Sequence, residues 1–251
     1  MMLAHDWEFN VLGIYNFRKA GKLDAYYDWL RKNHARVPGD VLEAGVFKGK
    51  SLLATALLLK ELGSDKRVFG YDSFSGFPPV YHDNDRIEMF EQLLRDGRIT
   101  AAHMKAHSKL VAHREFLKDT RIDVRTISSS EEFSQAGHAA ILRKADYLGL
   151  DNIVLVPGDF ASTMGEQGPA TDGALCACLV DCDLYASYVT TLNHVWPRLS
   201  KGGLMFLDEY FSLKFAGARI ACDEFFCDKM QKPQRLSSTD DDFFERWGVV
   251  K

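Results

Sequence analysis

Residues 37–51 read VPGDVLEAGVFKGKS and combine a short apolar strand with a glycine-bearing turn. After a Pro-Gly break, residues 40–46 form a buried-strand candidate, residues 47–50 a turn, and residues 51–62 a helix. A strand that leads through a glycine turn into a helix is typical of the first unit of an alternating α/β sheet. This stretch therefore predicts a parallel sheet covered by helices.

The rest of the chain repeats this alternation. Further strands are predicted over residues 67–72, 153–156, 175–181 and 203–208, and helices over residues 23–33, 138–148, 185–199 and 216–226. Residues 243–250 are rich in aromatic and β-branched side chains, which predicts an edge strand or hairpin. The order of elements predicts a single α/β domain over residues 1–251, built on a mostly parallel sheet.

A polar insertion from about residue 79 to residue 137 interrupts the alternation. Loops longer than about 12–15 residues are uncommon in compact domains, so we expect helices over residues 89–94 and 103–117. Because it follows the second strand, the insertion would form a helical cap at the rim of the sheet. Residues 1–38 would form a shorter N-terminal helical segment. His103 and His107 lack a third ligand and are expected at the surface.

Composition excludes several functional classes. The 251 residues carry 31 basic and 35 acidic side chains, a formal charge of −4, and 46% are hydrophobic. This length can bury a full core, and mild acidity without a basic block argues against a nucleic-acid partner. The apolar runs are too short to span a membrane, and the N-terminus lacks the apolar core of a signal peptide. With five cysteines in no framework spacing, the sequence predicts reduced thiols and a cytoplasmic location.

Acidic residues follow the ends of the predicted strands. In an open α/β sheet, ligands bind at the carboxyl ends of the strands, so these acids are expected along one rim. A single acid at a strand end is typical of a turn or a helix cap, but such a series favours a binding site. The acids are Glu43, Asp72, Asp159, the pair Asp181 and Asp183, and the pair Asp208 and Glu209.

The first turn indicates the kind of cofactor. Its G-x-x-x-G spacing lacks the first glycine of G-x-G-x-x-G and is a weak match to a dinucleotide site. Glu43, two residues before Gly45, would repel a phosphate but suits a cationic ligand. Asp72, at the end of the second strand, can accept hydrogen bonds from ribose hydroxyls. A nucleoside with a positive centre and no phosphate fits this pair, and S-adenosylmethionine is the candidate.

Asp181, Asp208 and Glu209 indicate a metal site. They follow two strands predicted to be neighbours, and carboxylates with open coordination positions suit a hard divalent cation, Mg²⁺ or Mn²⁺. Such an ion lowers the pKa of a bound hydroxyl and holds it in line with a methyl donor. Asp181 is placed to act as the general base while it binds the metal. The alternative is that Asp183 caps a helix and Glu209 faces solvent.

Four stretches resemble the macrocin O-methyltransferase (TylF/MycF-type) family of sugar O-methyltransferases. They are VPGDVLEAGVFKGKS, VFGYDSFSGFP, VDCDLYASYVTTLNHVWPRLSKGGLMFLDEY and GARIACDEFF. The resemblance implies a Rossmann-like class I methyltransferase sheet with an antiparallel last strand. It also implies S-adenosylmethionine as cofactor, a divalent metal held by three acids, and a homodimer or higher homo-oligomer.

The same resemblance assigns roles to individual residues. The first metal acid begins a D-x-D-L-Y motif and the other two belong to a D-D-Y motif, which gives Asp181, Asp208 and Glu209. Glu209 departs from the usual aspartate by one methylene. A histidine before the third strand is implicated in some relatives, and His138 is the nearest candidate for a catalytic role beside Asp181. The cofactor site would comprise Glu43, Gly45, Gly49, Ser51, Asp72, Ser73 and Asp159.

The sequence thus predicts an S-adenosylmethionine- and divalent-metal-dependent O-methyltransferase that acts on a hydroxyl of a sugar or glycosylated natural product. One alternative is a catechol-like or other small vicinal-diol acceptor. The others are an NAD(P)-dependent oxidoreductase and a non-catalytic nucleotide-binding protein. The absence of the first glycine of G-x-G-x-x-G and the presence of Glu43 disfavour the oxidoreductase. The three metal acids disfavour a protein without catalytic activity. Acceptor contacts are expected in the insertion.

Overall fold

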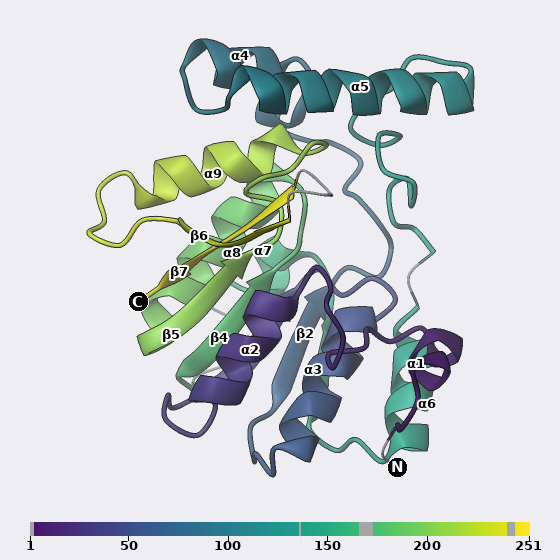
Figure 1. The fold of residues 1–251 in the computed structure, drawn as a ribbon, viewed down its shortest axis with the longest axis vertical. Coiled ribbons are helices and arrows are strands. Elements are labelled where there is room, and N and C mark those ends of the chain that lie inside the picture. The colour runs from purple at the N-terminus through teal and green to yellow at the C-terminus, as the bar shows by residue number, and fades with distance from the viewer. Residues whose placement is uncertain (1–2, 136, 166–172, 240–243) are drawn as a thin grey trace.

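The computed structural model describes residues 3–135, 137–165, 173–239 and 244–251, which build a seven-stranded sheet (Figure 1). The strand order is β3-β2-β1-β4-β5-β7-β6. The strands are β1 (Asp40–Ala44), β2 (Val68–Asp72), β3 (Ile153–Pro157), β4 (Leu175–Val180), β5 (Leu199–Leu207), β6 (Gln234–Thr239) and β7 (Phe244–Val250).

The first five strands are parallel, and β7 joins β5 in the antiparallel sense. This arrangement confirms the predicted Rossmann-like class I methyltransferase sheet with an antiparallel last strand. Residues 244–250 form a strand as expected, but it is not an edge strand or a complete hairpin: β7 lies between β5 and β6 and pairs with both. The strand β6 itself was not predicted, since its sequence QRLSST offers no alternating apolar pattern. β5 begins at Leu199, four residues before the predicted start.

Most of the helices fall where the apolar periodicity places them. Within the described ranges, no helix is both long enough and apolar enough to cross a membrane. The helices are α1 (Asp6–Leu12), α2 (Asp24–Asn33), α3 (Lys50–Glu61), α4 (Met89–Arg95), α5 (Ala101–Lys118), α6 (His138–Leu148), α7 (Phe160–Thr163), α8 (Tyr185–Arg198) and α9 (Ala216–Phe226), with a 3₁₀ turn η1 (Asp83–Asp85).

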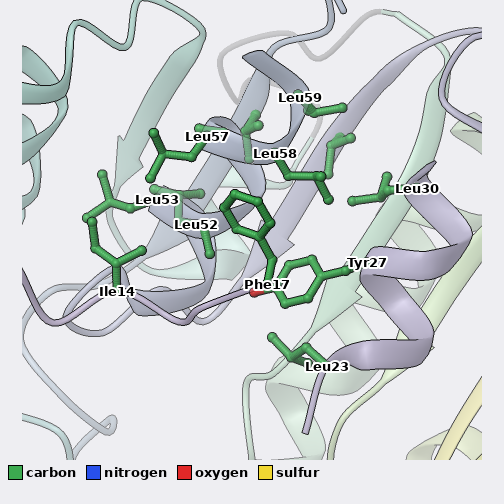
Figure 2. Packing of buried hydrophobic residues seen from close by; sticks show 14 of the residues in the cluster. Ile14, Phe17, Leu23, Tyr27, Leu30, Leu52, Leu53, Leu57, Leu58 and Leu59 are labelled. Atoms are coloured by element: carbon green, nitrogen blue, oxygen red, sulfur yellow. The ribbon is translucent and has the colours of Figure 1, made fainter. Parts of the chain in front are cut away.

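Alternation along the strands divides the core between the two faces of the sheet. Val41 of β1 joins the cluster formed with α2, α3 and α6, whereas the next residue, Leu42, joins the cluster formed with α8 and α9. On the first face, Phe17 and Tyr27 pack against the leucines of α3, with ring centroids 6.1 Å apart (Figure 2). The apolar N-terminal segment is therefore part of the core.

The insertion contains two helices, as predicted, and α4 and α5 lie together at one end of the molecule beyond α9 (Figure 1). Phe90 and Leu93 of α4 share a small apolar cluster with Ala216 and Ile220 of α9. The insertion is thus attached to the helix that follows β5.

The expectation that His103 and His107 lie at the surface is wrong. Both are 3% exposed. His103 Nε2 lies 2.9 Å from the carbonyl oxygen of Ser212, and His107 Nδ1 lies 2.8 Å from that of Leu213. The ring of His107 also stacks on Phe90 at 3.8 Å. The two histidines therefore fasten α5 to the loop after β5, since each ring donates to a backbone carbonyl.

Acidification should loosen this attachment. Burial lowers the pKa of both His103 and His107, so the folded chain favours the neutral rings. Unfolded histidine titrates near ~6.5, and stability should fall as the pH drops through that value, because the unfolded chain then binds more protons. We expect a smaller fall in melting temperature between about pH 7.5 and about pH 5.5 for the double variant His103→Gln/His107→Asn, whose amides keep a donor but do not titrate.

The matched control for this measurement is His113→Asn, because His113 is exposed on the same helix. It should show the same pH dependence as the parent chain. An unchanged pH dependence in the double variant would show that the histidine pair does not couple protonation to folding.

Candidate active site

Backbone hydrogen bonds continue past the carboxyl ends of the central strands. The amide of Asp181 donates to the carbonyl of Ala44 at 2.9 Å, and the amide of Asp208 donates to that of Val180 at 3.0 Å. These bonds extend the parallel register by one residue, so Asp181 and Asp208 leave neighbouring strands at the same level. The predicted convergence of acids at one rim is therefore present.

Gly45 permits the close contact between the first turn and β4. Its φ is +91°, and a Cβ at this position would lie 1.8 Å from the carbonyl oxygen of Asp181. No other residue fits there without moving the backbone of one strand end. The glycine-bearing turn and the first acid of the cluster are therefore in direct contact.

Asp181, Asp208 and Glu209 form a cluster in which one carboxylate oxygen from each lies within 4.8 Å of the others. Asp208 and Glu209 are buried, at 3% and 6% exposed, whereas the Asp181 side chain is 23% exposed. Among the residues that the structure describes, the buried atoms Asp208 Oδ1 and Glu209 Oε2 meet no hydrogen-bond partner. Buried carboxylate oxygens of this kind are costly unless a cation or donor meets them.

Basic side chains lie around the cluster. Lys22 Nζ is 3.2 Å from Asp208 Oδ2 and 3.5 Å from Asp181 Oδ2. An Arg246 guanidinium nitrogen is 3.7 Å from Asp208 Oδ1. Burial disfavours the charged form of Lys22, but Asp181 and Asp208 outweigh it and raise its pKa, so the lysine is charged.

The two aspartates titrate differently because they share these cations unequally. Burial and the nearby charge of Asp208 raise the pKa of Asp181 to about 7. For Asp208 burial acts in the same direction, but Lys22 and Arg246 outweigh it and lower its pKa. Asp208 is thus the more acidic member of the pair.

Tyr188 of α8 links the ends of β4 and β5. Its fully buried hydroxyl donates to the carbonyl of Val180 at 2.9 Å and accepts from the amide of Glu209 at 3.0 Å. One side chain therefore fixes the backbone on both sides of the carboxylate cluster.

Asp183 is a further site residue whose role the sequence left open between a helix cap and part of the acidic set. It is 8% exposed, has a φ of +59° and lines the same cavity as Asp181. Burial and the nearby Glu209 raise its pKa. The D-x-D spacing was the available signal, whereas no sequence pattern pointed to Lys22 or to Lys214, which also lines the cavity.

The second acid of the rim, Asp72, organises the glycine turn. Its Oδ2 accepts from the amides of Val46 and Phe47, both at 2.8 Å, and its Oδ1 accepts from the amide of Phe74 at 2.7 Å. The carboxylate thus holds the two turns that face the cavity. Ser73 follows it in the cavity wall and donates to the carbonyl of Gly76 at 2.9 Å.

Glu43 lies beneath this turn. It is 0% exposed, and its Oε1 accepts from Ser51 Oγ at 2.6 Å, while Oε2 has no hydrogen-bond partner in the described ranges. Burial raises its pKa well above the ordinary range. Glu43 is not among the described residues that line the cavity, whereas Gly45 and Ser51 are. Gly49 is the N-cap of α3 and has a φ of +74°.

Two remaining candidates lie away from the carboxylate cluster. Asp159 caps α7 by accepting from the amide of Ala161 at 2.8 Å, and it lines the cavity. His138 begins α6, is exposed, and its ring lies 5.6 Å from that of Phe74. It is not among the cavity-lining residues that the structure describes, so its catalytic role stays a prediction.

One cavity, with a volume of about 840 Å³, is lined by the glycine turn, the acidic strand ends and the insertion. Gly45, Asp72 and Asp159 line it together with Asp181, Asp183 and Glu209, so the glycine turn and the acidic cluster face one space. The insertion and its flanks add further wall residues, among them Phe77, Ser128, Ser129, Ser130 and Phe133. The T-shaped contact of Phe133 with Phe47, at 5.0 Å, joins the insertion to the glycine turn.

With this geometry established, comparison with known proteins identifies the class. A family model for a methyltransferase domain matches residues 42–210, and the chain belongs to this family. The match covers the strands and turns that carry the rim of acids.

Among curated proteins, the chain is similar to sugar O-methyltransferases. It is 29% identical over 177 residues to mycinamicin III 3''-O-methyltransferase of Micromonospora griseorubida, and this alignment covers 69% of this chain and 56% of that protein. It is also 29% identical over 175 residues to a tetracenomycin rhamnosyl 4'-O-methyltransferase of Streptomyces olivaceus, covering 69% and 54%. These relatives confirm the resemblance found in the sequence. The chain spans little more than half the length of each.

Solved structures show the same fold. The O-methyltransferase NovP superposes with a TM-score of 0.62 at 19% identity, covering 90% of this chain and 79% of that one. CalS11, a calicheamicin methyltransferase, gives a TM-score of 0.60 at 19% identity, covering 97% and 79%. At this identity the superpositions establish the class I methyltransferase fold.

Removal of the Tyr188 hydroxyl should weaken the site and the fold together. Tyr188→Phe conserves the ring but removes the acceptor of the Glu209 amide and one of the two donors to the Val180 carbonyl, which keeps the Asp208 amide. We therefore expect a loss of about 1–3 kcal/mol in the free energy of unfolding. Denaturant titration measures it. The control is Tyr185→Phe, whose hydroxyl bonds the exposed Glu224, and its effect should stay within about 0.5 kcal/mol. Equal stability of the two variants would contradict the linking role.

Proposed function

We propose that this protein is an S-adenosylmethionine- and divalent-metal-dependent O-methyltransferase that acts on a sugar or glycoside hydroxyl. The observation that carries the proposal is the shared cavity, which the glycine turn and Asp72 line together with Asp181 and Glu209 of the three-carboxylate cluster. A methyl donor and an ion-bound acceptor would meet in that space.

The cofactor would occupy the part of the cavity beside the glycine turn. Gly45 and Ser51 line it, Asp72 lies at the end of β2, and Asp159 lies after β3. Asp72 keeps acceptor capacity on Oδ1 for one ribose hydroxyl, because three backbone amides take the other acceptor sites of the carboxylate, about four in all. Glu43 would act from below by holding Ser51 and the start of α3.

The carboxylate cluster fits a divalent cation. Within the described part of the chain, Asp208 Oδ1 and Glu209 Oε2 are buried without hydrogen-bond partners, and oxygen-only donor sets are those that Mg²⁺ and Mn²⁺ prefer. Such an ion would supply Lewis acidity that lowers the pKa of a bound hydroxyl. Glu209 in place of the usual aspartate keeps the carboxylate, and Tyr188 fixes its backbone amide.

Asp181 is the group that we propose takes the proton of the acceptor hydroxyl. It is the most exposed carboxylate of the cluster and faces the cavity, so it is the one that an acceptor hydroxyl can reach. Asp183 offers a second carboxylate on the same wall. His138 lies at the start of α6, outside the cavity lining, which favours the aspartates for this role.

The acceptor class rests on the relatives and on the wall of the cavity. One relative is named for 3''-O-methylation of mycinamicin III, and another for 4'-O-methylation of a rhamnosyl tetracenomycin. In this chain, Tyr15, Phe77 and Phe133 line the cavity beside the three serines of the insertion. Aromatic faces with a few hydroxyl groups suit a sugar ring, which has apolar faces and a polar edge.

Calorimetry tests the cofactor. S-adenosylmethionine and its demethylated product should bind. Asp72→Asn should weaken binding by about tenfold or more, because asparagine replaces one of the two acceptor oxygens with an NH₂ donor. Asp223 of α9 is ion-paired away from the cavity and provides Asp223→Asn as a control variant. Binding of NAD in place of S-adenosylmethionine would refute the assignment.

Activity assays test the metal. Asp208→Asn and Glu209→Gln should lower turnover by about 10²-fold or more, while circular dichroism and cofactor affinity stay near those of the parent chain. Chelation should abolish activity and Mg²⁺ should restore it. Glu224→Gln, at an exposed position on α9, is the control and should keep full activity. Indifference to chelation would rule out the metal, and a panel of glycosides and catechols would separate the two acceptor classes.

A further inference from the structure

Lys22 reaches the carboxylate cluster from a segment far away in sequence. It lies between α1 and α2, one residue before the buried Leu23, and its side chain is 33% exposed. The segment is held nearby by the amide of Tyr15, which donates to the carbonyl of Lys50 at 3.1 Å. Lys22 Nζ also lies 5.7 Å from the centre of the Tyr15 ring. Both Tyr15 and Lys22 line the cavity.

The ammonium of Lys22 contacts the carboxylates that the proposed function assigns to the ion. Its nitrogen is 3.2 Å from Asp208 Oδ2 and 3.5 Å from Asp181 Oδ2, and those two residues belong to the three-carboxylate cluster. An ion ligated by the same carboxylates would repel an ammonium that stays among them. The lysine and a divalent ion would therefore compete for the same two carboxylates.

The cations already beside Asp208 favour exchange over joint occupancy. Lys22 Nζ is 3.2 Å from Asp208 Oδ2, and an Arg246 guanidinium nitrogen is 3.7 Å from Asp208 Oδ1. A divalent ion bound to the same carboxylate would therefore face two positive side chains at short range, and departure of Lys22 would relieve the closer repulsion.

We propose that Lys22 and the divalent ion occupy the carboxylate cluster in alternation, so that Lys22 is a positioning residue that holds Asp181 and Asp208 together until the ion displaces it. This proposal rests on the metal dependence proposed above. It makes the N-terminal segment sensitive to the ion, because displacement of Lys22 frees the side chain that connects Tyr15 to the cluster. It also means that the cluster binds the ion less tightly than the same three carboxylates would without Lys22.

Titration with Mn²⁺, followed by electron paramagnetic resonance of the free ion, tests the proposal on the full chain without cofactor. Lys22→Met keeps the aliphatic stem and removes the charge, so the variant should bind Mn²⁺ at least about tenfold more tightly than the parent. Lys50→Met is the matched control, since Lys50 lines the same cavity and lies 5.9 Å from the same Tyr15 ring. Its Mn²⁺ affinity should stay within about twofold of the parent's.

A thermal melt supplies a second readout. Without metal, Lys22→Met should melt at a lower temperature than the parent, because Asp208 loses its nearest cation. Saturating Mn²⁺ should remove this difference in melting temperature. Lys50→Met should show neither change. A Lys22→Met variant that melts like the parent without metal would contradict the holding role.

The outcomes separate this proposal from the proposed function. Mn²⁺ binding by the parent with equal or weaker binding by Lys22→Met would overturn the alternation and leave the metal site standing. Absence of Mn²⁺ binding in both chains at millimolar ion would overturn the metal dependence itself. The double variant Lys22→Met/Asp208→Asn should lose the gain in affinity, and retention of that gain would place the ion elsewhere and refute the proposal.

Discussion

Three carboxylates brought together at the ends of β4 and β5 are the constraint on which the rest of the site depends. The parallel register puts Asp181 and Asp208 at one level, and Tyr188 holds the backbone on both sides. Like charges at this spacing, two of them buried, require a cation. Lys22 and Arg246 supply positive charge from opposite ends of the chain, and the proposed ion would supply more.

The same constraint explains why distant segments converge on this rim. The N-terminal segment packs Phe17 and Leu23 into the core of one face and thereby delivers Lys22 to the cluster. The insertion contributes cavity wall through Ser128 and Phe133, and its helix α5 is fastened to the loop after β5 by two buried histidines. Both additions to the sheet therefore contact the parts that carry the acids.

The sequence predicted the local features of this arrangement well. Strands and helices of the sheet follow from apolar periodicity, and the acids at strand ends predicted the cluster because parallel strands end at one edge. The same reasoning assigned Glu43 to the cofactor, whereas its side chain is wholly buried below the turn against Ser51. Position at a strand end fixes the level of a residue but not the face of the turn on which it lies.

Features that depend on long-range contacts could not be predicted from the sequence. His103 and His107 are buried because carbonyls more than 100 residues away accept from them, and no spacing within α5 indicates such partners. Lys22 meets Asp208 across 186 positions for the same reason. The polar strand β6 exists because β7 offers a free edge, which its own sequence does not show.

The most direct test of this account is anomalous diffraction at the manganese edge, from crystals grown with Mn²⁺ and the demethylated cofactor product. The account predicts one strong peak within ligating distance of Asp181, Asp208 and Glu209, with the cofactor product beside the glycine turn. A cluster that keeps Lys22 at its centre and shows no peak in saturating Mn²⁺ would contradict it.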